Sequence, residues 1–281
     1  MKTGLVLEGG GFRGIYTAGV LDVFLENRIR PDGVIGVSAG AAHGCSFLSG
    51  QKGRSIDYYT RYCGDPRFMS LKSFLKTGDI VGADFAYHEL PEKLVPYDYE
   101  AFDNCGIPFF VTVANLETGL PEHIKINDML ADIEYLRASA SLPYFSRIVE
   151  INGKKYLDGG CADSIPIKAF REMGFERNII VLTRHDGYEK KQEHGLLAKL
   201  LYKKYPEFVK ALLGLSERYN RTLEYIRELE KNGEVFVIRP SRPLTIGRME
   251  HDPERVRAVY EIGAEDATRE MSALEAWLSR K

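Results

Sequence analysis

Residues 33–42 read GVIGVSAGAA, and this stretch decides the fold. Its apolar residues 34–37 predict a short buried strand, and the small residues that follow predict a helix over 39–48. Ser38 lies between them, flanked by Gly36 and Gly40. This Gly-x-Ser-x-Gly pattern is typical of a nucleophile elbow, in which the chain turns sharply from strand to helix. The flanking residues must be small because strand and helix approach closely there.

Ser38 would stand at the amino end of the helix over 39–48. Free backbone N–H groups and the positive end of the helix dipole favour negative charge that develops at such a position. The serine is therefore a candidate nucleophile. A glycine-rich turn that carries a capping serine is the plainer interpretation of the same residues.

A second glycine-rich segment, GGGFRG at residues 9–14, follows an apolar run at 4–8 and opens a predicted helix over 14–28. A Gly-x-Gly-x-x-Gly segment in this setting also marks dinucleotide-binding folds, which carry an acidic residue about 20 residues further on. Here the second strand ends in Ser38 instead. The pattern favours a loop of bare N–H groups that forms an oxyanion hole beside the elbow, although a tight turn without a ligand stays open. The residues concerned are Gly9, Gly10, Gly11, Arg13 and Gly14.

A third segment, Asp158-Gly159-Gly160, follows a predicted strand at 154–157. Asn152-Gly153 before it is a strong signal for a two-residue hairpin turn from a strand at 147–151. An acidic residue at the end of a strand lies where α/β sheets place their chemistry. Taken alone the signal is weak, because Asp-Gly is common in turns.

Strands and helices alternate along the chain, which predicts an α/β fold: a mostly parallel central sheet in a three-layer α/β/α arrangement. We expect a single domain over 1–281, because no linker rich in Pro, Gly or Ser interrupts it. Residues 65–103 are less regular and predict short helices and loops that cover a cleft. The remaining elements expected are strands at 109–114, 179–183 and 234–238, and helices over 128–140, 193–231 and 252–281.

The composition excludes several classes of protein. The 281 residues are 44% hydrophobic and 28% charged, which excludes a wholly disordered chain. The net charge of −2 gives no sign of a nucleic-acid partner. The scattered cysteines and histidines show no metal-ligand spacing, so we expect reduced thiols and no metal. The first apolar run is too short for a signal peptide and no run reaches about 18 apolar residues, so we expect a cytoplasmic protein.

Histidines raise a difficulty for a conventional triad, in which the chain order would be serine, acid, histidine. None of the six histidines stands in a distinctive motif. His185, at the end of a predicted strand, is the best candidate. His43 lies five residues after Ser38 on the same predicted helix, and we expect it to face away from the serine hydroxyl.

The three segments, in this order, resemble the patatin-like phospholipase family of lipid acyl hydrolases. Further similarity appears at 138–143, ASASLP, and at 163–166, DSIP, so the resemblance covers residues from about Gly4 to about Phe175. The remaining chain looks like a bacterial subgroup and adds no catalytic motif. Glu8 stands where the family often has aspartate, and we expect no loss from it because the position is structural.

The resemblance implies a Ser–Asp dyad that needs no histidine and no cofactor. Ser38 would attack the ester carbonyl, Asp158 would accept its proton, and an acyl-enzyme would form. The N–H groups of Gly10 and Gly11 would hold the oxyanion, with Gly9 permitting the turn. Arg13 would reinforce the charge or anchor the loop. The partner implied is a lipid or other ester substrate; the sequence gives neither the headgroup nor the oligomeric state.

Two further features bear on the substrate. Residues 196–213 are basic and amphipathic, which suits either peripheral contact with a membrane or a pair of helices packed on the core with their lysines in water. Several aromatic residues could line an acyl pocket or simply be core: Tyr58, Tyr59, Tyr62, Phe68 and Phe74. A nucleotide-binding protein that uses residues 9–14, and a non-catalytic protein that binds a membrane or partner, remain the alternatives.

Overall fold

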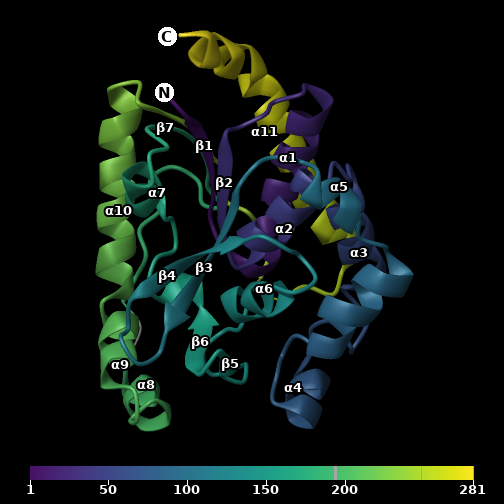
Figure 1. The fold of residues 1–281 in the computed structure, drawn as a ribbon, viewed down its shortest axis with the longest axis vertical. Coiled ribbons are helices and arrows are strands. Elements are labelled where there is room, and N and C mark those ends of the chain that lie inside the picture. The colour runs from purple at the N-terminus through teal and green to yellow at the C-terminus, as the bar shows by residue number, and fades with distance from the viewer. Residues whose placement is uncertain (193–194, 248, 281) are drawn as a thin grey trace.

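The computed structural model describes residues 1–192, 195–247 and 249–280, and shows a central sheet with helices on both faces (Figure 1). In these ranges the sheet has eight strands, in the order β5-β6-β3-β2-β1-β7-β8, with β4 paired to β3. Neighbours from β3 to β8 run parallel, as predicted. The strands are β1 (Thr3–Leu7), β2 (Gly33–Val37), β3 (Phe109–Asn115), β4 (Pro121–Ile126), β5 (Val149–Ile151), β6 (Lys154–Asp158), β7 (Arg177–Val181) and β8 (Val235–Ile238).

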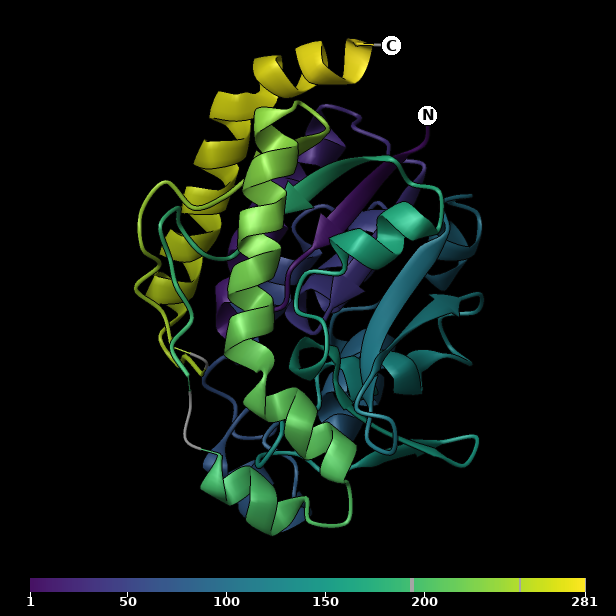
Figure 2. The same cartoon turned by 90° about the vertical axis from the view of Figure 1, so that its left-hand side faces the viewer.

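The helices divide between the two faces of the sheet because successive strand residues point to opposite sides. Leu5 and Leu7 of β1 pack with one group of helices, and Val6 between them packs with the other. Figure 2 shows the long α10 lying across the second face. The first group includes α1 (Ile15–Glu26), α2 (Ala39–Leu48), α3 (Arg54–Tyr62) and α11 (Pro253–Ser279); the second is α7 (Ile167–Glu172) and α10 (Leu215–Lys231). The three-layer prediction is confirmed.

The remaining helices are short. They are η1 (Gly11–Gly14), α4 (Leu71–Thr77), η2 (Phe85–Leu94), α5 (Tyr99–Asp103), α6 (Ile133–Ser139), η3 (Gly159–Cys161), α8 (Leu196–Leu201) and α9 (Pro206–Leu213). The irregular segment 65–103 thus holds α4, η2 and α5, as the sequence indicates. Part of the predicted helical stretch, residues 193–194, lies outside the described residues. No helix in the described ranges is long and apolar enough to cross a membrane.

One predicted element has wrong bounds, and one strand was missed. The helix predicted over 128–140 begins only at Ile133, because the Asp128 carboxylate accepts hydrogen bonds from the backbone of Leu130 and Ala131 and forms a turn. Strand β4 was not predicted. Its sequence, PEHIKI, is largely polar, and only Ile126 in it is buried, since the strand pairs with β3 alone.

Strands β2 and β6 both pair with the same edge of β3, and their ends meet there. One edge of β3 is paired with β4 along most of its length. The other edge pairs first with β2, in parallel, and then with β6, antiparallel. Val37 at the end of β2 is opposite Thr112, and Asp158 at the end of β6 is opposite the next residue, Val113. The carboxyl ends of β2 and β6 therefore meet head to head on one edge of β3.

Candidate active site

Ser38 forms the sharp turn between β2 and α2, with φ 53° and ψ −124°. This backbone conformation is one that L residues rarely adopt, and it persists only where the surroundings enforce it. The flanking glycines leave the room it needs. A Cβ on Gly36 would stand 2.6 Å from the Cα of Ala41, and one on Gly40 would stand 2.5 Å from the Leu7 carbonyl oxygen. The close approach of strand and helix predicted from the sequence is therefore present.

Replacing Gly40 with alanine is expected to destabilise the fold by about 2 kcal/mol or more, because the new methyl group meets backbone atoms that cannot move aside. Gly64→Ala is the matched control: the nearest atom to its Cβ is the His251 carbonyl oxygen at 3.8 Å, an ordinary contact. Chemical denaturation of both variants measures the difference in their free energies of unfolding. Equal unfolding midpoints would contradict the close packing at the elbow.

The head-to-head ends of β2 and β6 bring the serine hydroxyl to the aspartate. Ser38 Oγ donates a hydrogen bond to Asp158 Oδ2 at 2.7 Å. The second carboxylate oxygen, Oδ1, accepts from the backbone N–H of Gly160 at 2.8 Å. Both side chains are buried. The carboxylate is thereby held with one oxygen on its own turn and the other on the serine.

Glycines after the aspartate allow the same close approach as those at the elbow. A Cβ on Gly159 would stand 2.1 Å from the Thr112 carbonyl oxygen, so β3 excludes any larger residue there. Gly160 supplies the N–H that orients Asp158. A Cβ on Gly160 would stand 3.0 Å from Asp158 Oδ1, so the pattern Asp158-Gly159-Gly160, weak as a sequence signal, has a packing reason at both glycines.

Ser139 connects these parts, and the sequence did not single it out as a site residue. Its hydroxyl accepts a hydrogen bond from the Ser38 N–H at 2.8 Å and donates one to the Thr112 carbonyl at 2.7 Å. Two residues on, the Ser141 carbonyl accepts from the Asp158 N–H at 2.8 Å. The segment ASASLP, noticed only as a family similarity, therefore fixes the backbone at both ends of the Ser–Asp pair.

The glycine loop lies against the elbow. A Cβ on Gly9 would stand 3.1 Å from the Cβ of Ser38, and Gly11 has φ 56°, a left-handed conformation that suits glycine. Among the described residues, no backbone hydrogen bond engages the N–H of Gly10 or Gly11. Gly9, Gly10 and Gly11 line a cavity with Ser38 and Asp158. Two free N–H donors of the described chain therefore lie beside Ser38.

Three further residues lie around the loop, at positions 8, 13 and 14. Glu8, buried, accepts hydrogen bonds from the Thr183 N–H at 2.5 Å and the Tyr219 hydroxyl at 2.6 Å, which fits the structural role expected for it. Gly14 lets α1 start against α2, since a Cβ there would meet that of Ala39 at 2.5 Å. Burial, and then the neighbouring Arg184, lower the pKa of Arg13.

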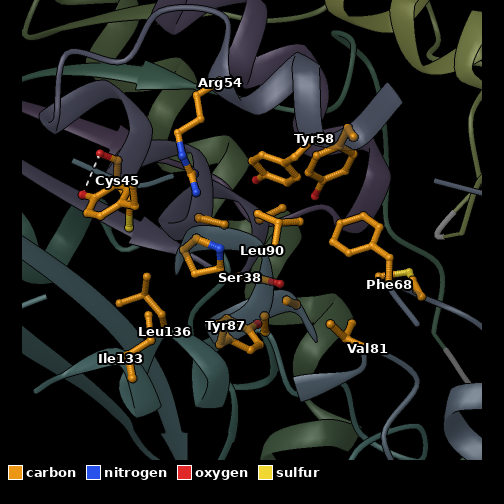
Figure 3. Close-up of a pocket in the computed structure, with 18 of the residues that line it drawn as sticks. Ser38, Cys45, Arg54, Tyr58, Phe68, Val81, Tyr87, Leu90, Ile133 and Leu136 are labelled. Carbon is orange, nitrogen blue, oxygen red and sulfur yellow. Dashed lines mark hydrogen bonds between the residues drawn. The ribbon is translucent and has the colours of Figure 1, made fainter. Parts of the chain in front are cut away.

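Two cavities meet at Ser38. The first has a volume of about 130 Å³, comparable to apolar cavities of ~150 Å³ that hold a benzene ring. Figure 3 shows Ser38 among its apolar walls. They come chiefly from α3, η2 and α6, and include Tyr58, Tyr59, Phe68, Tyr87, Leu90, Ile133 and Leu136. The second cavity, about 150 Å³, is more polar and is lined by Arg13, Asp158, Ser164 and Lys190 as well as by residues 142–144.

Of the five aromatic residues that could line a pocket or be core, Tyr58, Tyr59 and Phe68 line the first cavity, and the other two do not. The ring of Tyr62 packs on Phe85, and the ring of Phe74 packs on Phe145, outside the cavity. The sequence also missed the walls supplied by η2 and α6, because their residues look like ordinary core.

Histidines lie elsewhere. His43 is buried and its ring bonds the Ser55 hydroxyl at 3.0 Å; burial lowers its pKa to about 3, so it is neutral at physiological pH. His185 lines a separate small cavity with Asp186 and Arg239. Among the described residues, no hydrogen bond joins a histidine to Ser38 or Asp158, and no group of three His, Cys, Asp or Glu side chains is placed to hold a metal.

Known families match most of the chain. The family described as "Patatin-like phospholipase" matches residues 5–171. A second family, a domain of unknown function designated DUF6363, matches residues 205–279. The first match contains the glycine loop, the elbow, the ASASLP segment and Asp158.

Individual known proteins are also similar to this chain. The uncharacterized protein YjjU of Escherichia coli is 31% identical over 187 residues, covering 65% of this chain and 52% of YjjU. Lysophospholipase NTE1 of Cryptococcus neoformans is 30% identical over 64% of this chain and 11% of its own length. The chain thus spans about half of one relative and about a tenth of the other. VipD from Legionella pneumophila, a solved structure, aligns with 97% of this chain and 67% of its own at a TM-score of 0.47 and 13% identity.

Proposed function

This chain belongs to the patatin-like phospholipase family, and from that premise we propose that it hydrolyses carboxylic esters of lipids through a Ser38–Asp158 dyad. The observation that carries the proposal is the 2.7 Å hydrogen bond from Ser38 Oγ to Asp158 Oδ2. A nucleophile and its base within hydrogen-bond reach, with the base oriented by a third group, is the geometry that covalent catalysis requires. Here the third group is the N–H of Gly160.

The reaction proceeds in two halves. Ser38 Oγ attacks the ester carbonyl carbon as its proton passes to Asp158, and the carbonyl oxygen becomes an oxyanion beside the N–H groups of Gly10 and Gly11. The intermediate collapses, the ester C–O bond breaks, and Asp158 returns the proton to the leaving alcohol. Water then attacks the acyl-enzyme, gives its proton to Asp158, and releases the carboxylic acid while Ser38 recovers its hydrogen.

Electrostatic stabilisation carries much of the rate in this scheme. An aspartate in water has a pKa of about 3.9 and is a weak base towards a hydroxyl. Preorganised N–H donors offset that weakness, and losing one such donor typically costs about 10²–10³ in rate. The loop at Gly10 and Gly11 and the amino end of α2 supply donors and a positive dipole end at the same point.

The two cavities suit the two halves of a lipid. We assign the apolar one, walled by α3, η2 and α6, to the acyl chain, and the polar one, with Arg13 and Lys190, to the alcohol and its headgroup. One apolar cavity beside one polar cavity fits an ester that carries a single acyl chain. This assignment agrees with the name of the NTE1 relatives, although the chain covers only about a tenth of those proteins.

The whole chain forms one catalytic unit in this proposal. Strand β8 extends the sheet next to β7. Helix α11 packs on α1 so closely that a Cβ on Gly19 would stand 2.1 Å from the Tyr260 carbonyl oxygen, and one on Gly263 would stand 2.0 Å from that of Tyr16. Residues 205–279, the second matched region, therefore pack against the strands and helices of the first and help to stabilise them.

Release of fatty acid from defined lipids tests the proposal. The purified chain is expected to release acid from a lysophosphatidylcholine and from p-nitrophenyl butyrate, and Ser38→Ala is expected to release none. Absence of hydrolysis of either ester, and of a diacyl phospholipid, by folded protein would contradict it. A saturable thermal stabilisation by NAD, NADP or ATP would instead favour nucleotide binding at residues 9–14.

A further inference from the structure

Helix α8 presents leucines to the outside of the molecule. Its sequence, LLAKLL, is anchored by Ala198, which is 1% exposed. Four leucines of the same helix are half or more exposed, with Leu196 at 84%. Monomeric proteins rarely expose several neighbouring large apolar side chains to water unless that surface binds a partner or a membrane. The exposed leucines are Leu196, Leu197, Leu200 and Leu201.

Helix α4 does the same. Leu75 is 85% exposed, and Leu71, one turn earlier, is also largely exposed. Phe145, itself partly exposed, extends this surface, since its ring packs at 6.2 Å on Phe74 of α4. Figures 1 and 2 both place α4 and α8 at the same end of the molecule, the lower one, far from the two termini.

The segment 142–145 joins the two helices to the site. On the α4 side, the Phe145 carbonyl accepts a hydrogen bond from the Ile80 N–H at 2.7 Å. On the α8 side, the Tyr144 N–H donates to the hydroxyl of Tyr202, just past the helix, at 2.9 Å. Leu142, between Ser139 and Tyr144, lines both cavities that meet at Ser38. The exposed leucines therefore flank the segment that borders the active site.

The charged side chains within these two helices all have one sign. Neither α4, LKSFLKT, nor α8, LLAKLL, contains an acidic residue. Exposed lysines alternate with the leucines in both helices and continue just past α8, although the chain as a whole carries a net charge of −2. Apolar side chains interleaved with lysines are the pattern of interfacial helices that bind anionic lipid. The lysines are Lys72, Lys76, Lys199, Lys203 and Lys204.

We propose that α4, Phe145 and residues 196–204 form one docking face, here called the leucine face, for the surface of an anionic lipid bilayer. The leucines enter the boundary between headgroups and acyl chains while the lysines contact the lipid phosphates. A second copy of the chain is a poorer occupant, because a two-fold interface would set the same lysines against each other. Binding of the leucine face to a bilayer does not depend on the proposed function. Only the consequence of that binding, delivery of lipid to Ser38, rests on the proposed function.

Vesicle co-sedimentation tests the leucine face. The Ser38→Ala chain, which leaves the lipid intact, is the parent. We expect it to sediment with vesicles of phosphatidylcholine mixed with phosphatidylglycerol, and far less with phosphatidylcholine alone or in high salt. Leu196→Glu/Leu200→Glu, and separately Leu75→Glu, are expected to lower the bound fraction about tenfold, because each sets a charge in the interface. Met173→Glu alters an exposed apolar residue at the end of α7, outside the leucine face, and this variant is expected to bind like the parent.

Activity separates this proposal from the proposed function. With Ser38 restored, the leucine variants are expected to keep the wild-type kcat/KM on p-nitrophenyl butyrate and to lose hydrolysis of vesicle lipid about tenfold, in step with binding. The docking face would be overturned if the Ser38→Ala parent did not bind vesicles, or if the leucine variants bound them as well as the parent does. A concentration-dependent dimer that these variants dissociate would also overturn it. Vesicle binding lost in the variants, with no ester hydrolysed by the wild type, would uphold the face and overturn only the proposed function.

Discussion

Ser38→Ala is expected to lower kcat for ester hydrolysis by about 10⁴-fold or more, because it removes the atom that forms the acyl-enzyme. Within the described ranges its hydroxyl donates to Asp158 alone, so the variant keeps the other hydrogen bonds of the fold. Hydrolysis of p-nitrophenyl butyrate by wild type and variant, at matched concentrations of folded protein, measures the effect. A loss of less than about tenfold would mean that another group attacks the ester.

Ser38→Gly provides the control for folding. Glycine adopts φ 53°, ψ −124° without the penalty that other residues incur there, of order 1–3 kcal/mol. This variant is expected to be as inactive as Ser38→Ala and to unfold at a higher denaturant concentration. If it were less stable than Ser38→Ala, the elbow would not be a strained conformation held for function.

Asp158→Asn is expected to lower kcat by about 10³–10⁴-fold, in the range seen when an orienting aspartate becomes asparagine in other serine hydrolases. The amide keeps an oxygen that accepts from the Gly160 N–H, so the turn is preserved. It cannot accept the serine proton. Kinetics on the soluble ester and far-ultraviolet circular dichroism together separate lost chemistry from lost folding.

Asp163→Asn is the matched control for that variant. Asp163 lies five residues further on, and burial raises its pKa to about 6; its carboxylate accepts from the Ile165 N–H rather than contacting Ser38. Its replacement is expected to change kcat only a few-fold. An equal loss of activity in Asp158→Asn and Asp163→Asn would contradict the assignment of Asp158 as the catalytic base.

The elbow was predictable from sequence because its requirements are local. Gly36 and Gly40 are needed for the approach of one strand to the helix that follows it, and Asn152-Gly153 likewise fixes its own hairpin, both residues having positive φ. The partnership of Ser38 with Asp158 is not local. It depends on β2 and β6 sharing one edge of β3, which no spacing in the sequence states. The family resemblance alone pointed to the pair.

Other features were hidden for physical reasons. Strand β4 is polar because it pairs with β3 alone, so it lacks the apolar run of a central strand. Ser139 reads as one small residue among several, and its role depends on reaching the Thr112 carbonyl and the Ser38 N–H together. The leucines of α8 fit a core helix by sequence; only their exposure separates the two interpretations.

Covalent labelling by a fluorophosphonate, read by intact mass and peptide mapping, tests the central claim most directly. Such a reagent reacts with a serine whose hydroxyl is activated beside an oxyanion hole. The account predicts one adduct, on Ser38, that is absent from Ser38→Ala and strongly slowed in Asp158→Asn. Folded wild-type protein that stays unlabelled with and without detergent, or that is labelled at another residue, would contradict it.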